Sequence, residues 1–169
     1  MMFKRKWVTQ KVVARLPNAT KTLVTQTPSA LLRFSLAYWL NFAFRDPIKQ
    51  GELDFIKQRR ILIQVTDIAL RFSVGQEKNR LVVNITNDKA DVLVAAELKD
   101  FMLLAAGKID PDTLFFRRRL RITGDTELGL AVKNLLDRVE ITKILPPFLY
   151  RGLLELTEEL AEQDIKHPA

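Results

Sequence analysis

Residues 107–137 constrain the fold of this chain more than any other stretch of it. They read GKIDPDTLFFRRRLRITGDTELGLAVKNLLD, which is a turn, a strand with one apolar and one basic face, a Gly-Asp corner and an amphipathic helix. Asp125 stands where it can cap that helix, and Leu128, Val132 and Leu135 recur behind it at helical spacing. The segment predicts a strand that turns sharply into a helix with one apolar face, and it contains no group equipped for bond-breaking chemistry.

Strand-like segments precede this stretch. They are rich in β-branched and aromatic residues, and a turn at 75–79 between two of them predicts a hairpin. A helix is expected at 97–106, stopped by Gly107, and residues 51–57 read as a short helix. Short turns join most of these segments, which indicates an α+β fold with helices layered on a largely antiparallel sheet. The five expected strands are 61–66, 68–74, 81–86, 90–95 and 119–123.

A further helix is predicted from Pro28 to about Arg45, with Thr27 as its N-cap. Its apolar side chains surround nearly the whole circumference. Such a helix is either buried on all sides or in contact with a ligand cavity or a membrane. The first interpretation makes it the central helix of the core. Its apolar run, 30–44, is too short to span a bilayer, which takes about 20 residues.

The net charge of +7 is concentrated at the beginning of the chain. Residues 1–45 hold eight basic side chains and no acidic one, and the remaining residues are close to neutral. The apolar stretch after the first basic residues is interrupted by polar ones, so we expect no cleaved signal peptide. A basic N-terminal arm favours anionic partners, either phospholipid headgroups or nucleic acid. Its candidate contacts with an anionic surface are Lys4, Arg5, Lys6, Lys11, Arg15 and Lys21.

The residues that usually carry catalysis are scarce. The chain has no cysteine, and its single histidine is His167 near the end. Ser-His and Cys-His nucleophilic pairs and most transition-metal sites are therefore excluded. The acidic pairs Asp110/Asp112 and Asp125/Glu127 are typical of a turn and of a helix start. We expect a non-enzymatic protein with no cofactor and no metal. The lack of cysteine is compatible with the cytoplasm.

Residues 117–121 combine several arginines with a predicted strand. Either the arginines form a solvated strand face, or they form a cationic patch for headgroups or phosphates. Phe115 and Phe116 precede them, and adjacent side chains of a strand point to opposite faces. One aromatic ring is therefore expected inside, and the other needs a helix, a ligand or a partner to cover it.

These motifs resemble the sterol carrier protein type-2 domain. The resemblance rests on Gly107-Lys108, the Asp110–Asp112 turn, Leu114–Phe116 and the Leu-x-Ile-x-Gly-Asp strand at 120–125. Residues 110–130, DPDTLFFRRRLRITGDTELGL, resemble more narrowly the UbiT family of bacterial accessory factors of ubiquinone biosynthesis. Many sterol carrier domains have glycine where this chain has Arg118.

The resemblance implies a five-stranded sheet whose helices enclose an apolar tunnel for lipid, without catalytic residues. It also implies a role in the oxygen-independent branch of ubiquinone synthesis beside the UbiU and UbiV proteins. The ligand would be an isoprenoid quinone precursor or a phospholipid, with transient contact at the inner face of the membrane. The candidate lining residues are Trp39, Phe42, Phe101, Leu104, Phe115, Phe116, Leu128, Val132 and Leu135.

Three parts of the chain are expected: a basic arm at 1–27, the lipid-binding domain at 28–145, and an amphipathic helix and tail at 146–169. Two other functions stay open on the residues alone. The basic arm and the arginines suggest nucleic-acid binding, although the near-neutral body argues against it and we expect no nucleic-acid partner. The acidic C-terminal helix suggests a protein–protein adaptor.

Overall fold

A five-stranded sheet forms the centre of the protein, in a computed structural model that describes residues 20–86, 88–138, 154 and 157. The strand order is β3-β2-β1-β4-β5; three neighbouring pairs are antiparallel, and β1 and β4 are parallel. The predicted α+β fold with a largely antiparallel sheet is confirmed. The strands are β1 Ile61–Val65, β2 Leu70–Glu77, β3 Arg80–Ile85, β4 Val92–Ala96 and β5 Arg121–Gly124.

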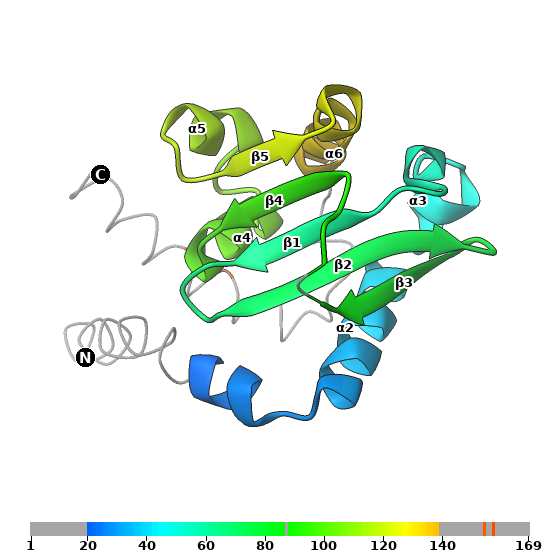
Figure 1. The fold of residues 1–169 in the computed structure, drawn as a ribbon. Helices are drawn as coiled ribbons and strands as arrows, with labels where there is room; N and C mark the ends of the chain where they lie inside the picture. The colour runs from blue at the N-terminus through cyan, green and yellow to red at the C-terminus, as the bar shows by residue number, and fades with distance from the viewer. Residues whose placement is uncertain (1–19, 87, 139–153, 155–156, 158–169) are drawn as a thin grey trace.

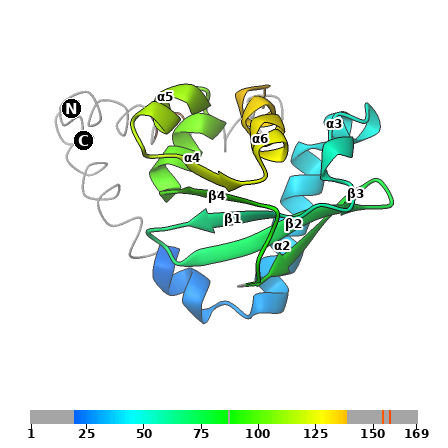
Figure 2. The ribbon, with the colours of Figure 1, turned by 45° about the horizontal axis from the view of Figure 1, so that its top comes forward.

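Helices cover one face of this sheet. Figure 1 shows α4 and α6 behind the strands and α2 beside β3, while the connection from β3 to β4 crosses the other face; in Figure 2, α4 and α6 are seen above the sheet. Residues 20–26 are also helical. The named helices are α2 Ser29–Ala43, α3 Arg45–Lys49, the 3-10 turn η1 Asp54–Ile56, α4 Leu98–Ala105, α5 Pro111–Phe116 and α6 Thr126–Arg138.

The apolar core lies between the sheet and its helices. Alternate residues of each strand point to this inner face, because side chains of a strand alternate. Val92 and Val94 of β4 are fully buried there, as is Leu114 of α5. The predicted stripe of α6 packs on the same core through Leu128, Val132 and Leu135.

The Gly-Asp corner between β5 and α6 forms as predicted. Gly124 has a φ of +119°, and a Cβ built on it would lie 2.2 Å from the backbone oxygen of Asp91, so only glycine fits. Asp125 accepts a hydrogen bond from the backbone N–H of Leu128 at 3.0 Å, which caps α6. Gly129 lets the helix approach β5, because a Cβ there would lie 3.1 Å from Ile122 Cγ2.

The interpretation of α2 as the central core helix is wrong. None of its residues is buried, and it packs against β3 at the side of the sheet. Its start also differs from the prediction: Pro28 is the N-cap, and the Thr27 hydroxyl donates to the Leu23 carbonyl oxygen instead of capping. The apolar side chains on one side of α2 therefore pack against the rest of the protein, and those on the other side are exposed.

The segment around Phe115 and Phe116 is helical, so the strand prediction for them is wrong. Asp110 caps α5 by accepting from the backbone N–H and the hydroxyl of Thr113, and Pro111 occupies the first helical position. The Asp-Pro pair, interpreted as a turn, is therefore a helix start. Most of the basic arm, and all of the C-terminal helix predicted at 146–169 except residues 154 and 157, lie outside the described residues.

Candidate functional site

An apolar cavity of about 530 Å³ lies between the sheet and the helices. This volume is in the usual range for small-molecule sites, roughly 300–1,000 Å³. Every described residue that lines it is apolar. The helical side contributes Leu36, Trp39, Leu40, Ala43, Phe44, Leu53, Ile56, Phe101, Leu104, Ala105, Val132, Leu135 and Leu136, and the sheet contributes Ile61, Ile63, Val65, Leu70, Phe72, Val74 and Leu81.

The exposure of these side chains distinguishes a closed end from a rim. Leu53 and Ile56 are buried, as is Val74 on the strand beside them. Trp39 is 44% exposed and Phe101 is partly exposed. Trp39 therefore belongs both to the cavity and to the outer face of α2. An apolar molecule in this space would be held by burial of its surface, since none of the described lining residues offers a polar side chain.

Five of the predicted lining residues meet in this cavity: Trp39, Phe101, Leu104, Val132 and Leu135. Leu128 is not among the lining residues and is buried in the core, and Phe42 points outward from α2 with 47% of its surface exposed. Phe115 and Phe116 lie at a separate, open groove beside β5. Whether any of these residues binds a lipid stays a prediction.

The strand residues of the cavity were not foreseen as lining residues. Ile61, Ile63 and Val65 of β1, with their register partners Val74 and Phe72 of β2, form the wall opposite the helices. The sequence did contain a signal for them, because alternate residues of two predicted neighbouring strands must lie on the same face of the sheet. The side of the sheet that the helices would cover was not determined by that pattern.

A buried ion pair holds the cavity helix α4 to the segment before β5. Asp100 is 1% exposed and accepts a hydrogen bond from the guanidinium of Arg119. Burial raises the pKa of Asp100, although the Arg119 hydrogen bond acts in the opposite direction. Arg119 is therefore not part of a solvated strand face, whereas Arg118 and Arg121 are exposed.

Asn41 fixes α2 to the free edge of β3. Its side-chain amide donates to the Leu81 carbonyl oxygen at 2.7 Å, and its oxygen accepts from the Leu81 N–H at 2.9 Å. These two bonds pair the outward backbone groups of Leu81 on an edge strand, which would otherwise need water or another chain. The polar residue in an apolar helix thus positions the helix beside the cavity.

The outer side of α2 carries exposed aromatic rings. Tyr38, Trp39 and Phe42 stack edge-to-face along the helix, with ring centroids 5.9 and 6.1 Å apart. Phe34 is 72% exposed one turn earlier. Of the predicted anionic-surface contacts, Lys21 is described and exposed, and the other five lie outside the described residues.

Within the described residues, no helix is long and apolar enough to cross a membrane. The same residues contain no group of three or more His, Cys, Asp or Glu side chains that would hold a metal ion.

Comparison with known sequences gives a consistent result. The model of the SCP-2 sterol transfer family matches residues 39–137. The ubiquinone biosynthesis accessory factor UbiT of Escherichia coli is 43% identical over 148 residues, which is 88% of this chain and 84% of that protein. Human sterol carrier protein 2 is 32% identical over 71 residues, covering 36% of this chain and 13% of the human protein.

Solved structures share the fold at low sequence identity. The UbiJ-SCP2 ubiquinone synthesis protein superposes with a TM-score of 0.53 at 18% identity, over 66% of this chain and 97% of that one. Sterol carrier protein domain 2 of Helicoverpa armigera gives a TM-score of 0.50 at 16% identity, over 64% and 89% of the two chains.

Proposed function

Because this chain belongs to the SCP-2 sterol transfer family and is a homologue of the accessory factor UbiT, we propose that it is a non-catalytic lipid-binding accessory factor of ubiquinone biosynthesis. Its ligand would be a prenylated quinone precursor, held by its apolar chain. The observation that carries this proposal is the cavity of about 530 Å³, whose described lining residues are all apolar. Apolar surface removed from water contributes roughly 25 cal/mol per Å², so a prenyl chain needs few polar contacts there.

Native mass spectrometry with added prenylated phenol tests this proposal. The wild-type protein should take up the lipid. Ala105→Trp should not, because Ala105 lines the cavity and indole at that position fills it. Ala30→Trp is the matched control, since Ala30 is exposed near the start of α2. Equal uptake by both variants, or none by the wild type, would reject the cavity as the binding site.

We further propose that the aromatic side of α2 contacts the membrane from which the lipid is loaded. Aromatic side chains favour the interface between headgroups and acyl chains. No acidic residue occurs before Asp46, so Lys21, Arg33 and Arg45 would meet anionic headgroups without local repulsion. Trp39 belongs to both the cavity rim and this face, so contact would bring the opening toward the bilayer.

Co-sedimentation with vesicles tests the membrane contact. Phe34→Ser should lower partition onto vesicles that contain anionic lipid, by about tenfold if most of the ring is buried there. Phe116→Ser is the matched control, because Phe116 is similarly exposed but belongs to α5, which lies away from α2 (Figure 1). Binding that is unaffected by Phe34→Ser would remove α2 from the contact.

The domain bounds, the location, the biosynthetic branch and the protein partners are proposals as well. We propose a lipid-binding domain at 28–145 between a basic arm and a C-terminal segment, peripheral attachment at the inner face of the membrane, and action in the oxygen-independent branch together with UbiU and UbiV. Quinone analysis of a deletion strain grown without oxygen tests the branch. Co-purification of UbiU and UbiV with the tagged chain, under the same growth conditions, tests the partners.

A further inference from the structure

The two edges of the sheet differ in how their backbone groups are paired. At the β3 edge, Asn41 binds the outward N–H and carbonyl of Leu81. At the β5 edge, the described residues provide no such cover. An exposed edge strand is a template for pairing with another chain, and folded proteins usually block it. Among the described residues, the β5 edge is therefore the one without a side chain that pairs its outward backbone groups.

The outward groups of β5 belong to Ile122 and Gly124. The backbone N–H of Asp125 donates to the Asp91 oxygen at 2.9 Å, so that residue pair is hydrogen-bonded. Bonded and non-bonded pairs alternate in an antiparallel ladder, and the next bonded pair of β5 and β4 is therefore Thr123 with Leu93. The N–H and carbonyl groups of Ile122 and Gly124 consequently face away from β4.

An apolar groove of about 390 Å³ lies directly beside these groups. α5 contributes Phe115 and Phe116 to it, and α6 contributes Gly129 and Leu130. Phe116 is 80% exposed and Leu130 is 56% exposed, although both are large and apolar. A concave apolar surface next to an open strand edge fits an extended peptide, which satisfies backbone groups that a lipid surface leaves unpaired.

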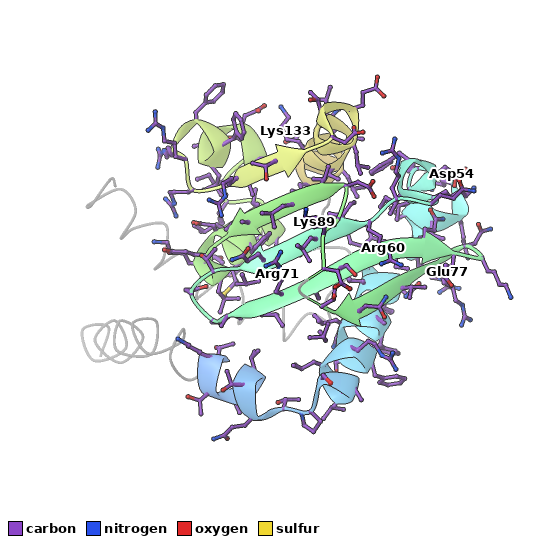
Figure 3. The ribbon with its side chains drawn as sticks, in the orientation of Figure 1. Asp54, Arg60, Arg71, Glu77, Lys89 and Lys133 are labelled. Carbon is purple, nitrogen blue, oxygen red and sulfur yellow. The ribbon has the colours of Figure 1, made fainter. Side chains whose placement is uncertain are left out.

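The charges around the groove favour an acidic partner. Its acidic side chains are already engaged. Asp112 of α5 pairs with Lys133 of α6 at 2.6 Å (Lys133 is labelled in Figure 3), and Asp125 pairs with Arg59 at 3.2 Å. Arg121 points to the other face of β5, where it is exposed and would be a cross-strand neighbour of an added strand. Arg118, also exposed, extends the positive charge.

We propose that this edge groove, lined by Phe115, Phe116, Leu130 and the outward backbone of β5, binds an extended segment of a protein partner as a sixth strand. The segment alternates apolar residues, which enter the groove, with acidic residues, which lie beside Arg121. This docking site is distinct from the apolar cavity, so lipid and partner protein bind on different surfaces. The proposal does not depend on the identity of the lipid.

Nuclear magnetic resonance titration with synthetic heptapeptides tests the proposal. One peptide alternates valine with glutamate, and the matched peptide alternates valine with lysine. The glutamate peptide should shift the amide signals of Ile122, Gly124 and Leu130 and slow the solvent exchange of the Ile122 and Gly124 amides. Phe116→Ser should weaken its binding by about tenfold, and Arg121→Glu should reverse the preference between the two peptides.

Phe34→Ser is the matched control, because it removes a similarly exposed ring from α2 and should leave peptide binding unchanged. Thermal unfolding verifies that each variant is folded. Absence of binding, equal binding of both peptides, or signal shifts confined to other surfaces would overturn the proposal. So would anionic phosphatidylglycerol vesicles that shift the same amides while the glutamate peptide does not, since the groove would then be a membrane contact.

Discussion

Asp100 and Arg119 form an ion pair in which both side chains are largely withdrawn from solvent. Removing one member of a buried pair leaves an uncompensated charge, which costs about 3–5 kcal/mol. Arg119→Met should therefore lower the free energy of unfolding by this amount in urea denaturation. The double variant Asp100→Leu/Arg119→Met should recover most of the loss. A double variant as unstable as Arg119→Met would show that the arginine acts through other contacts.

Two aspartates at helix starts, Asp110 and Asp125, contribute to the sensitivity of the fold to acid. A hydrogen bond from the Thr113 hydroxyl lowers the pKa of Asp110, and the backbone N–H of Leu128 lowers that of Asp125. A folded-state pKa below the unfolded value of 3.8 means that stability is present above that pH and is lost as the pH falls through the folded pKa. The raised pKa of Asp100 acts in the opposite direction, because acid removes the penalty of a buried charge.

We expect the free energy of unfolding to decrease as the pH falls below about 4. The variant Asp110→Asn/Asp125→Asn should show a shallower decrease, since asparagine caps helices about as well as aspartate but does not titrate there. Chemical denaturation at several pH values measures both. An unchanged acid dependence in the variant would assign the loss to other carboxylates.

At the scale of single residues, the sequence was most informative where one backbone geometry is required. The glycine at 124 and the cap at 125 followed from the Gly-Asp corner. Phe115 and Phe116 were misplaced because the Asp-Pro pair before them was interpreted as a turn, although aspartate followed by proline is also a helix start. The Asn41–Leu81 bonds had no sequence signal, because their partners are 40 residues apart.

Among the secondary-structure elements, α2 has the clearest test, because the side chain of Asn41 attaches it to β3. Asn41→Leu should leave the Leu81 N–H and carbonyl without their partners and lower the free energy of unfolding by about 1–3 kcal/mol. Hydrogen exchange should accelerate at Leu81 and along α2 in particular. Asn84→Leu is the matched control, because Asn84 is exposed on the same strand. Equal acceleration in both variants would mean that Asn41 does not anchor the helix.

The strands and α6 were predictable because each contains its own periodic pattern. The parallel pairing of β1 with β4 was not, because it depends on a crossover whose endpoints are set by packing of the whole sheet. α2 was misjudged for a related reason. Its apolar side chains surround the helix, which indicates that both sides are shielded from water. The pattern does not specify whether protein or membrane covers each side.

For the whole molecule, the sequence predicted an apolar site and five of its twenty described lining residues. The five predicted residues are all on helices, where they stood out as surplus aromatic and aliphatic side chains. The β1 and β2 residues were not predicted, since strand residues of a solid core and of a cavity wall have the same pattern. Cavity walls and solid cores differ in how neighbouring elements are spaced, which is a property of the assembled fold.

The fixed volume of the cavity leads to a prediction about chain length. In a series of phenols with one, two, three or more prenyl units, affinity should first rise by about 0.8 kcal/mol per buried CH₂ as an upper value. It should level off once about 530 Å³ is filled, because further units remain outside. Ligand-induced increases in melting temperature measure this series. Leu104→Phe should shift the plateau to a shorter chain, since Leu104 lines the cavity. An affinity that keeps rising with every unit would place the chain along an open surface instead.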